Sequence, residues 1–561
     1  MGKHRNKIAV ALVLIMCASL LIACGQAAPA ASSAAPGSQA PQQSQSQAPS
    51  SLPAPQEPKG SAIPSGMMSA APEEPDVKYA EHLEIIQSNN VTGTLSVLSP
   101  AANSDPTFWK QNLFLEALLA WNFDGDDYLP KLATSWSSTD YKTFVFKLRD
   151  DVYFHNGDKF TAQDIINTIG LAQEFGAGSP AMTAWGMVSD AKAPDPYTIE
   201  ITLSQVNVDF YYEMCQPSAG ILNKRAIDAD ADTGPWIGTG AYKVADFSSN
   251  EFALFERFDD HWDDSLNCIS KSMVFRFIPE MSARTVRMQT GESHFSFGTS
   301  ADDMYLFEDD PDYEVFGLMF NHPSYVSFNM TDPICADHNF RMAVNYALDR
   351  VEIALMARGE WAFPVVDRGN LWGRNTPYRA DIPPFQQDLA KAREYLEQSI
   401  YNGEELSLAA ANVTNVRAAQ SVQQQLSLIG IKTRIDEFDT AAMSKFVQDP
   451  NSGVQLVHAN ANLNLLPNSI RHAVYPGGAQ NWIHLNDPEI NQLLDEVGTL
   501  FDESAREAHF KRVQERLSEI QPYALTYHTV LNIVCVSGFG GVVLSPDNRM
   551  HDFRQAYLII G

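Results

Sequence analysis

The chain has 561 residues, of which 45% are hydrophobic and 19% charged, the composition of an ordinary globular protein. Its 68 Asp and Glu outnumber its 39 Lys and Arg, so the formal net charge at pH 7 is −29. This charge argues against nucleic acid or an anionic lipid surface as the ligand, and the length predicts two or three domains.

The first 23 residues have the pattern of a secretory signal peptide. Three cations, Lys3, Arg5 and Lys7, precede an unbroken apolar run over 8–22. The run ends in Leu21-Ile22-Ala23-Cys24-Gly25, the lipobox pattern, in which the peptide is cut before a cysteine that becomes lipidated. We therefore expect Cys24 to begin the mature chain and to anchor it to a membrane. The alternative is an uncleaved anchor with an incidental cysteine.

A flexible tether is predicted over 24–76. Residues 25–56 carry no charge and consist mainly of Ala, Ser, Pro and Gln. Such a composition cannot bury enough apolar area to offset the entropy of ordering. The folded domains are expected to begin near Val77.

The best-marked stretch of the chain is 141–169. Phe144, Phe146 and Leu148 alternate with polar or exposed positions, which predicts a strand, and 151–154 repeats the alternation and predicts a second strand. Residues 155–158 then predict a turn. Thr161 is expected to cap a helix, with Asp164 favourably placed in its first turn.

This stretch, with Leu129 to Trp136 just upstream, resembles the signature of the family 5 extracellular solute-binding proteins, the peptide- and nickel-binding group of ABC importers. The resemblance continues through the strand predicted at 193–201, the "dxYW" element at 258–262 and the helix predicted at 340–350. Most side chains of the signature have packing or turn roles, so it identifies the family without forming the binding site.

Two glycine-marked segments have simple structural interpretations. Gly238-Thr239-Gly240 lacks the Lys-Ser/Thr pair and the third spaced glycine of a phosphate-binding loop. In the resembled family this run marks the return of the chain from a small domain to the first lobe. The segment 282–292 predicts a helix closed by Gly291.

The second half of the chain predicts a βαβ unit. Residues 406–413 favour a buried strand, the apolar positions before Gly430 favour a helix, and 431–435 favour another strand, which should be parallel to the first. Two late helices are predicted around 490–497 and 510–520, the second ending before Pro522.

The resemblance implies an α/β fold, the type II periplasmic-binding-protein fold, with two lobes, a hinge and an inserted small domain. The expected organisation is a signal peptide at 1–23, a lipidated linker at 24–76, first-lobe segments at 77–122, 234–330 and 533–561, the small domain at 123–233, and the second lobe at 331–532.

No cofactor and no metal are expected. Apart from Cys17 and Cys24, the cysteines are Cys215, Cys268, Cys335 and Cys535, which have no C-x-x-C spacing, and both disulfides and buried thiols are open to them. The acidic residues at 309–314 lack the spacing of a calcium loop and favour a solvated turn.

The chain is not expected to be an enzyme, because it has no G-x-S-x-G elbow and no H-E-x-x-H pair. The resemblance implies a monomer that captures a small solute, most simply a peptide or peptide-like one, and delivers it to the permease subunits of an ABC importer. The alternatives are a binding protein of this fold for an oligosaccharide or a metal chelate, a sensor or adhesin, and, least favoured, a secreted hydrolase.

Peptide binders of the family pair the peptide amino group with an Asp that follows a second-lobe strand near a Trp. The corresponding stretch here, 454–467, has neither residue and carries Asn instead, so a free peptide amino terminus is not the expected ligand group. His458 in this stretch favours a packing role over metal binding.

Closure around a solute needs aromatic platforms and neutral hydrogen-bonding groups. We predict a neutral or anionic solute rich in hydroxyl or amide groups, with Arg471 available for a carboxylate. A packing role is the alternative for both tryptophans. The candidate ligand-binding residues are Asn103, Asp105, Trp361, Trp372, Asn460, Asn462, Asn464 and Arg471.

Overall fold

The computed structural model describes residues 63, 67–72, 76–87, 94–102, 105–122, 127–175, 178–365, 369, 371–372, 377–461, 463, 467–478, 480–545 and 550–561. The predicted signal peptide, Cys24 and most of the predicted linker lie outside them. Chain contacts divide the protein into 1–54 and 55–561, and every element below belongs to the second unit. No helix among the described residues is both long and apolar enough to cross a membrane.

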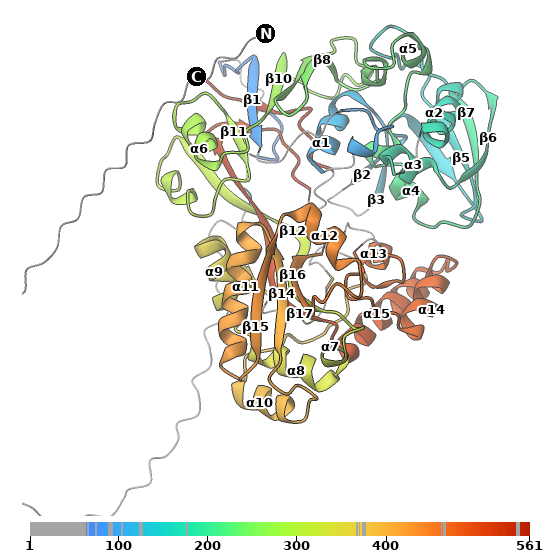
Figure 1. Ribbon diagram of the computed structural model, residues 1–561. Coiled ribbons are helices and arrows are strands. Elements are labelled where there is room, and N and C mark those ends of the chain that lie inside the picture. The colour runs from blue at the N-terminus through green and yellow to red at the C-terminus, as the bar shows by residue number, and fades with distance from the viewer. Residues whose placement is uncertain are drawn as a thin grey trace, which may run out of the picture. The chain divides into compact units, whose positions relative to one another are not determined.

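An eleven-stranded sheet runs through the structure in the order β15-β14-β16-β12-β17-β11-β1-β10-β9-β8, with β13 beside β17 (Figure 1). The first-lobe strands are β1 (His82–Gln87), β8 (Tyr242–Ser248), β9 (Phe252–Arg257), β10 (Ser272–Phe277) and β11 (Phe295–Phe297). The second-lobe strands are β13 (Phe363–Pro364), β14 (Glu405–Ala411), β15 (Lys432–Phe438) and β16 (Leu456–Asn460).

Two long antiparallel strands, β12 (Tyr313–Phe328) and β17 (Tyr523–Val536), belong to both lobes. The end of β17 pairs with β11, where Cys535 lies opposite Phe295, and the end of β12 pairs with β16, where Phe328 lies opposite Leu456. The chain therefore crosses between lobes inside these strands. The domain limits at 330/331 and 532/533 stay predictions.

The first lobe also contains α1 (Asp105–Phe114), α6 (Met281–Gln289), the short pair β18 (Phe539–Gly540) and β19 (Tyr557–Leu558), and the 3-10 turns η1 (Pro100–Ala102), η3 (Gly234–Trp236) and η4 (Met304–Leu306). Between them stand a hairpin of β2 (Leu119–Asn122) and β3 (Asp127–Pro130) and a four-stranded sheet, β4 (Ala133–Ser137), β5 (Thr143–Leu148), β7 (Thr198–Leu203) and β6 (Val188–Asp195). The helices of this small domain are α2 (Ala162–Phe175), α3 (Pro180–Trp185), α4 (Phe210–Glu213), η2 (Pro217–Ala219) and α5 (Lys224–Ala229).

The central second-lobe strands β14 and β16 are buried on both faces, whereas β15 at the sheet edge is partly exposed. On β14, Leu408 and Ala410 pack into one apolar cluster while Ala409 and Ala411 pack into another, as the alternation of a strand requires. The first cluster holds α8 (His338–Ala347), α9 (Arg350–Arg358) and α11 (Asn412–Ser427), and the second holds α12 (Thr440–Val447), α13 (Arg471–Val474), α14 (Pro488–Val497) and α15 (Glu503–Ile520). The lobe is completed by α7 (Pro333–Ala336), α10 (Leu389–Glu397), η5 (Gly359–Trp361) and η6 (Pro467–Ile470).

The signature stretch forms one of its two predicted strands. β5 is present, with Phe144, Phe146 and Leu148 buried. The strand predicted at 151–154 is wrong, because this segment has only an isolated bridge between Tyr153 and Lys159. Its alternation has another cause: Val152 and Phe154 fill the core from an irregular turn while Tyr153 faces solvent.

The cap of the helix after this turn differs from the prediction, because the acceptor is Asp164 and not Thr161. The backbone N–H and the hydroxyl of Thr161 both donate to Asp164 Oδ2, at 2.8 and 3.0 Å. One buried carboxylate in the first turn of α2 thus satisfies the backbone N–H and the hydroxyl of the residue before the helix.

The segment Gly238-Thr239-Gly240 needs glycines because it packs closely against another part of the chain. A Cβ added at Gly238 would lie 1.8 Å from the carbonyl oxygen of Phe114, and one at Gly240 would lie 2.4 Å from that of Leu113. Thr239 between them donates to Glu116 Oε2 at 3.0 Å. The run thus lets the chain pass directly against the end of α1.

The βαβ prediction is confirmed. β14 and β15 are parallel and α11 connects them. The first strand ends two residues earlier than predicted, because Asn412 takes a left-handed conformation (φ 61°) and starts the helix. Both late helices are present, and Gln521, also left-handed, ends α15 before Pro522.

Candidate functional site

The parallel strands of both lobes direct their carboxyl ends to the same part of the sheet. In the first lobe these ends are Gln87, Phe277 and Phe297, and in the second lobe they are Ala411, Phe438 and Asn460. On β12, Phe316 lies opposite the residue of β17 that pairs with Phe297, and Ser324 lies opposite Asn460 of β16. The strand ends of the two lobes are therefore separated by roughly 25 Å along β12. Ligands of open α/β sheets bind at such strand ends. We call this the carboxyl-end region.

A buried lysine stands at the first-lobe side of this region. Lys110 on α1 donates from Nζ to Oε1 of Gln87 at 2.9 Å, and its ammonium lies 5.2 Å from the ring centroid of Phe275. Burial lowers the pKa of Lys110 to about 7. The sequence analysis missed this residue, and the available signal was a cation directly after Phe108 and Trp109.

An aromatic group lies beside Lys110. His551 stacks on Phe297 with a centroid distance of 5.8 Å, and the rings of Trp109 and Phe320 lie 4.8 and 6.3 Å from His551. Phe320 belongs to β12 and Phe297 ends β11. The crossing strand is therefore packed directly against the carboxyl end of the first lobe.

Asn460 marks the second-lobe side. Its Oδ1 accepts a hydrogen bond from Ser324 Oγ of β12 at 2.5 Å, and its side chain is partly exposed. His458, two residues earlier, is buried beside Thr526, and burial lowers its pKa to about 3. The neutral imidazole fits the packing role expected from the sequence.

The two predicted tryptophans are buried. Trp361 in η5 packs against the crossing strands β12 and β17. Its ring lies 3.9 Å from the position that a Cβ on Gly317 would take. Trp372 donates from Nε1 to the carbonyl of Pro377 at 3.0 Å, and its ring lies 5.9 Å from that of Phe510. Both positions fit a packing role, and ligand contact by either residue stays a prediction.

Arg471 already has a carboxylate partner. Its Nη2 lies 2.9 Å from Asp495 Oδ1, and its guanidinium lies 3.8 Å from the ring centroid of Tyr475. It borders a cavity of about 440 Å³ between the small domain and α14 and α15. A solute carboxylate at Arg471 would have to compete with Asp495.

The other candidates have no described side chains. Asn103, Asn462 and Asn464 lie outside the described residues, and Asp105 begins α1 with only its backbone described. The structure thus brings Asn460 to the carboxyl-end region, together with Lys110, and places Arg471 at a different cavity.

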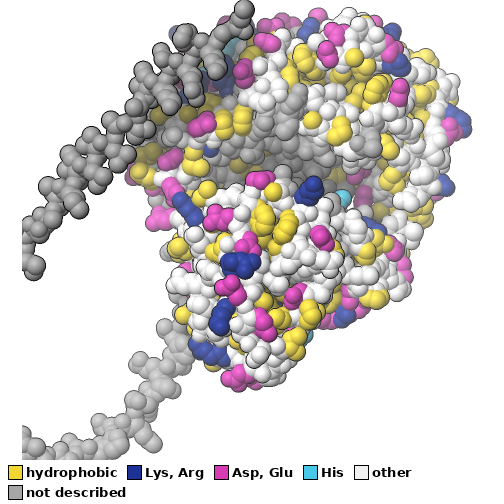
Figure 2. All heavy atoms as spheres, in the orientation of Figure 1, with side chains coloured by type: hydrophobic (Ala, Val, Ile, Leu, Met, Phe, Trp, Pro, Cys, Tyr) yellow, Lys and Arg dark blue, Asp and Glu magenta, His cyan; other side chains and the backbone are white. Residues whose placement is uncertain are grey.

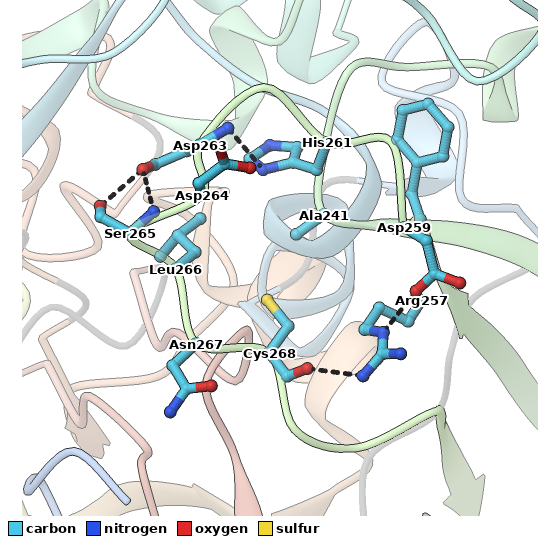
Figure 3. A pocket seen from close by; sticks show the side chains of 11 residues that line it. Ala241, Arg257, Asp259, His261, Asp263, Asp264, Ser265, Leu266, Asn267 and Cys268 are labelled. Atoms are coloured by element: carbon cyan, nitrogen blue, oxygen red, sulfur yellow. Dashed lines mark hydrogen bonds and ion pairs between the residues drawn. The ribbon is translucent and has the colours of Figure 1, made fainter. Parts of the chain in front are cut away.

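A cavity of about 610 Å³ follows β9 on the first lobe, and several of its polar groups pair with one another (Figure 3). The N–H of Asp263 donates to His261 Nδ1 at 3.3 Å, and Arg257 donates to Asp259 at 2.7 Å and to the carbonyl of Cys268 at 2.9 Å. Within the described part of the chain, no three His, Cys, Asp or Glu side chains are placed to hold a metal ion. The cysteines at 215, 268, 335 and 535 are all free thiols.

Charge gives no further guide to a site on the face drawn in Figure 2. Asp and Glu side chains are spread over that face, with Lys and Arg among them, and do not gather into one patch. The face therefore presents no surface typical of a polyanion-binding protein.

Comparison with known proteins gives the family. The profile for "Bacterial extracellular solute-binding proteins, family 5 Middle" matches residues 127–481, more than half of the chain. The glutathione-binding protein GsiB of Escherichia coli strain K12 is 25% identical over 336 residues, which cover 58% of this chain and 65% of GsiB. The chain thus spans slightly less than two thirds of the length of this curated relative.

Solved structures show the same fold. The ABC transporter substrate-binding protein CtaP of Listeria monocytogenes superposes with a TM-score of 0.75 at 24% identity, over 86% of this chain and all of that one. DppA of Helicobacter pylori, in complex with the peptide STSA, gives 0.70 at 22% identity, over 86% and 99%. The predicted type II periplasmic-binding-protein fold is confirmed. The chain belongs to the family 5 bacterial extracellular solute-binding proteins, which are non-catalytic binding proteins.

Proposed function

We propose that the protein is the solute-binding component of an ABC importer and that it encloses one small solute at the carboxyl-end region. The observation that carries this proposal is the convergence of parallel strand ends from both lobes around the crossing strands β12 and β17. Two crossing strands permit one lobe to rotate against the other, as hinge closure requires. The permease subunits of the importer are the proposed partners.

The proposed solute is peptide-like. Among similar proteins, one is named for glutathione, one holds a peptide, and one holds a complex of nickel with L-histidine. Asn460 supplies a neutral amide at the strand end, where a bound ammonium would need a carboxylate. We therefore favour a peptide-like solute with a modified amino terminus, rich in amide or hydroxyl groups.

Native mass spectrometry of the purified protein tests both points, since such proteins can retain their solute. The expected result is one co-purified small molecule per chain, with amide or hydroxyl groups. A plain peptide with a free amino terminus would overturn the solute class, and catalytic conversion of the bound molecule would overturn the binding function.

The binding residues are tested with the solute so identified. Replacing Asn460, Asn462 and Arg471 together by Ala should weaken binding at least tenfold in a calorimetric titration. Asn491→Ala on α14, whose amide donates to Asn486 Oδ1, is the control and should bind as the parent does. Equal affinity of the triple variant and the parent would defeat this assignment of the site.

We further propose that Cys24 carries the lipid that holds the protein at the outer face of the membrane. Two or more acyl chains are needed for stable retention, and the cysteine sulfur is their attachment point. Cys24→Ser should give an uncleaved precursor that incorporates no labelled palmitate. A processed Ser variant that still fractionates with membranes would contradict the proposal.

A further inference from the structure

A third cavity lies beneath the β2–β3 hairpin of the first lobe and has a volume of about 320 Å³. Its walls come from the end of α1, from the hairpin, and from the returning segment near the C-terminus. The lining includes Asn112, Leu119, Trp121, Leu129, Lys131 and Met550. None of Gln87, Lys110, His551 and Asn460 lines this cavity, so it is separate from the proposed solute site.

Lys131 is the unusual member of this lining. Within the described part of the chain, its ammonium has no hydrogen-bond acceptor and no carboxylate within 4.0 Å, unlike the other charged groups around the cavity. Burial, followed by the nearby Arg554, lowers the pKa of Lys131 to about 8, against the opposing effects of Glu116 and Asp552. A partly buried ammonium without a direct partner is unfavourable, so this position favours a ligand that brings a negative charge.

The neighbouring charged groups have partners other than Lys131, and Glu116 Oε1 lies 3.5 Å from His261 Nε2. Arg554 donates from Nε to Asp552 Oδ1 at 3.0 Å and from Nη2 to Oδ2 at 2.7 Å. Oε2 of the buried Glu116 accepts from Trp262 at 2.8 Å as well as from Thr239. The Lys131 ammonium is therefore the charged group of this cavity that is available to pair with a ligand.

The rest of the wall is mainly apolar. Leu119, Leu129, Val543 and Met550 contribute hydrocarbon surface, and Trp121 adds an aromatic ring held against Tyr128 and Tyr212. Burial raises the pKa of the Cys215 thiol, so it lines the cavity as a neutral group. The volume is at the lower end of the range for small-molecule sites.

From this combination we propose that the cavity binds a small monocarboxylate with a short apolar body. The carboxylate would form a charge-assisted hydrogen bond with Lys131, and the hydrocarbon part would lie against the leucines and Met550. A dianion would be disfavoured by Asp552 and Glu116, which lie close enough to affect the charge of Lys131. This site does not depend on the proposed transport function.

The experiment uses the full chain and carboxyl-labelled hexanoate, followed by carbon NMR, with hexanol as the uncharged analogue. The parent should bind hexanoate saturably at one site per chain and hexanol at least tenfold more weakly. Lys131→Met should weaken hexanoate binding at least tenfold, whereas Lys142→Met, at an exposed position of the small domain, should change it less than twofold. Asn460→Ala should also leave it unchanged, which separates this site from the solute site.

A second readout needs no variant. Binding by the parent should weaken progressively as the pH rises from 7 to 9.5, because the Lys131 ammonium loses its proton in this range while hexanoate stays ionised. Absence of saturable binding by the parent, equal binding of hexanol, equal binding by Lys131→Met, or a flat pH profile would each overturn the proposal.

Discussion

Arg506 on α15 and Asp209, the residue before α4, form an ion pair between the second lobe and the small domain. Nη2 of Arg506 lies 2.8 Å from Oδ1 of Asp209, and their side chains are only 17% and 12% exposed. Burial raises the pKa of Asp209, against the opposing effect of Arg506. Two segments 297 residues apart thus share a largely desolvated pair.

Removal of one partner should be costly because the other charge stays buried. We expect Arg506→Met to lower the free energy of unfolding by about 2 kcal/mol or more, measured by urea denaturation. The control is Arg434→Met, which removes an exposed ion pair with Asp436 and should cost less than about 1 kcal/mol. Equal effects of the two variants would contradict the role given to the buried pair.

Gly238 should tolerate no side chain. Gly238→Ala brings a methyl group into the carbonyl of Phe114, a backbone atom that cannot move without shifting the end of α1. The expected result is loss of folded protein or a destabilisation above about 3 kcal/mol. Gly170→Ala on α2, where a Cβ meets nothing within 4 Å, should be neutral or stabilising by about 0.5–1 kcal/mol. Comparable thermal stability of the two variants would refute the close-packing explanation.

The carboxylate that caps α2 gives a smaller effect. Asp164→Ala removes the acceptor of two Thr161 donors and should destabilise the protein by about 1 kcal/mol in chemical denaturation. Gln163→Ala, one position earlier and exposed, is the matched control. A cost at position 164 no larger than at 163 would show that the cap is unimportant.

Two buried histidines should make the protein acid-sensitive. Burial lowers the pKa of His458 and of His551 to about 3, whereas the unfolded value is near 6.5. Between these pH values the unfolded state binds more protons, so the free energy of unfolding falls as pH falls, by up to about 1.4 kcal/mol per pH unit for each histidine.

Urea denaturation at a series of pH values from 6.5 to 4 measures this slope. His458→Gln should reduce it, and the exposed His82→Gln should leave it unchanged. The histidine explanation fails if both variants keep the parental slope.

The sequence correctly predicted the elements that are determined by residues close to one another in the chain. The parallel β14 and β15 and the stop of α15 before Pro522 depend on periodicity or on residues a few positions apart. The strand at 151–154 was mispredicted because Val152 and Phe154 alternate in burial without a partner strand, and pairing cannot be inferred from alternation alone.

The site depends on contacts that local pattern does not contain. The bond between Lys110 and Gln87 spans 23 residues, and the bond between Ser324 and Asn460 spans 136. Arg471 was predicted to be available for a carboxylate because its pairing with Asp495 on the following helix has no sequence signal. Residue type indicated which groups could bind a solute, and the sheet topology determines which of them meet.

The sharing of β12 and β17 also determines how this protein can be divided. A fragment cut at 330/331 would remove from β16 the strand that carries Ser324 and Phe328, and would leave a row of backbone donors and acceptors unpaired. The second lobe should therefore be insoluble when expressed over 331–532. A fragment over 313–536 keeps β12 and β17 together with every strand between them, so this lobe retains its described sheet neighbours.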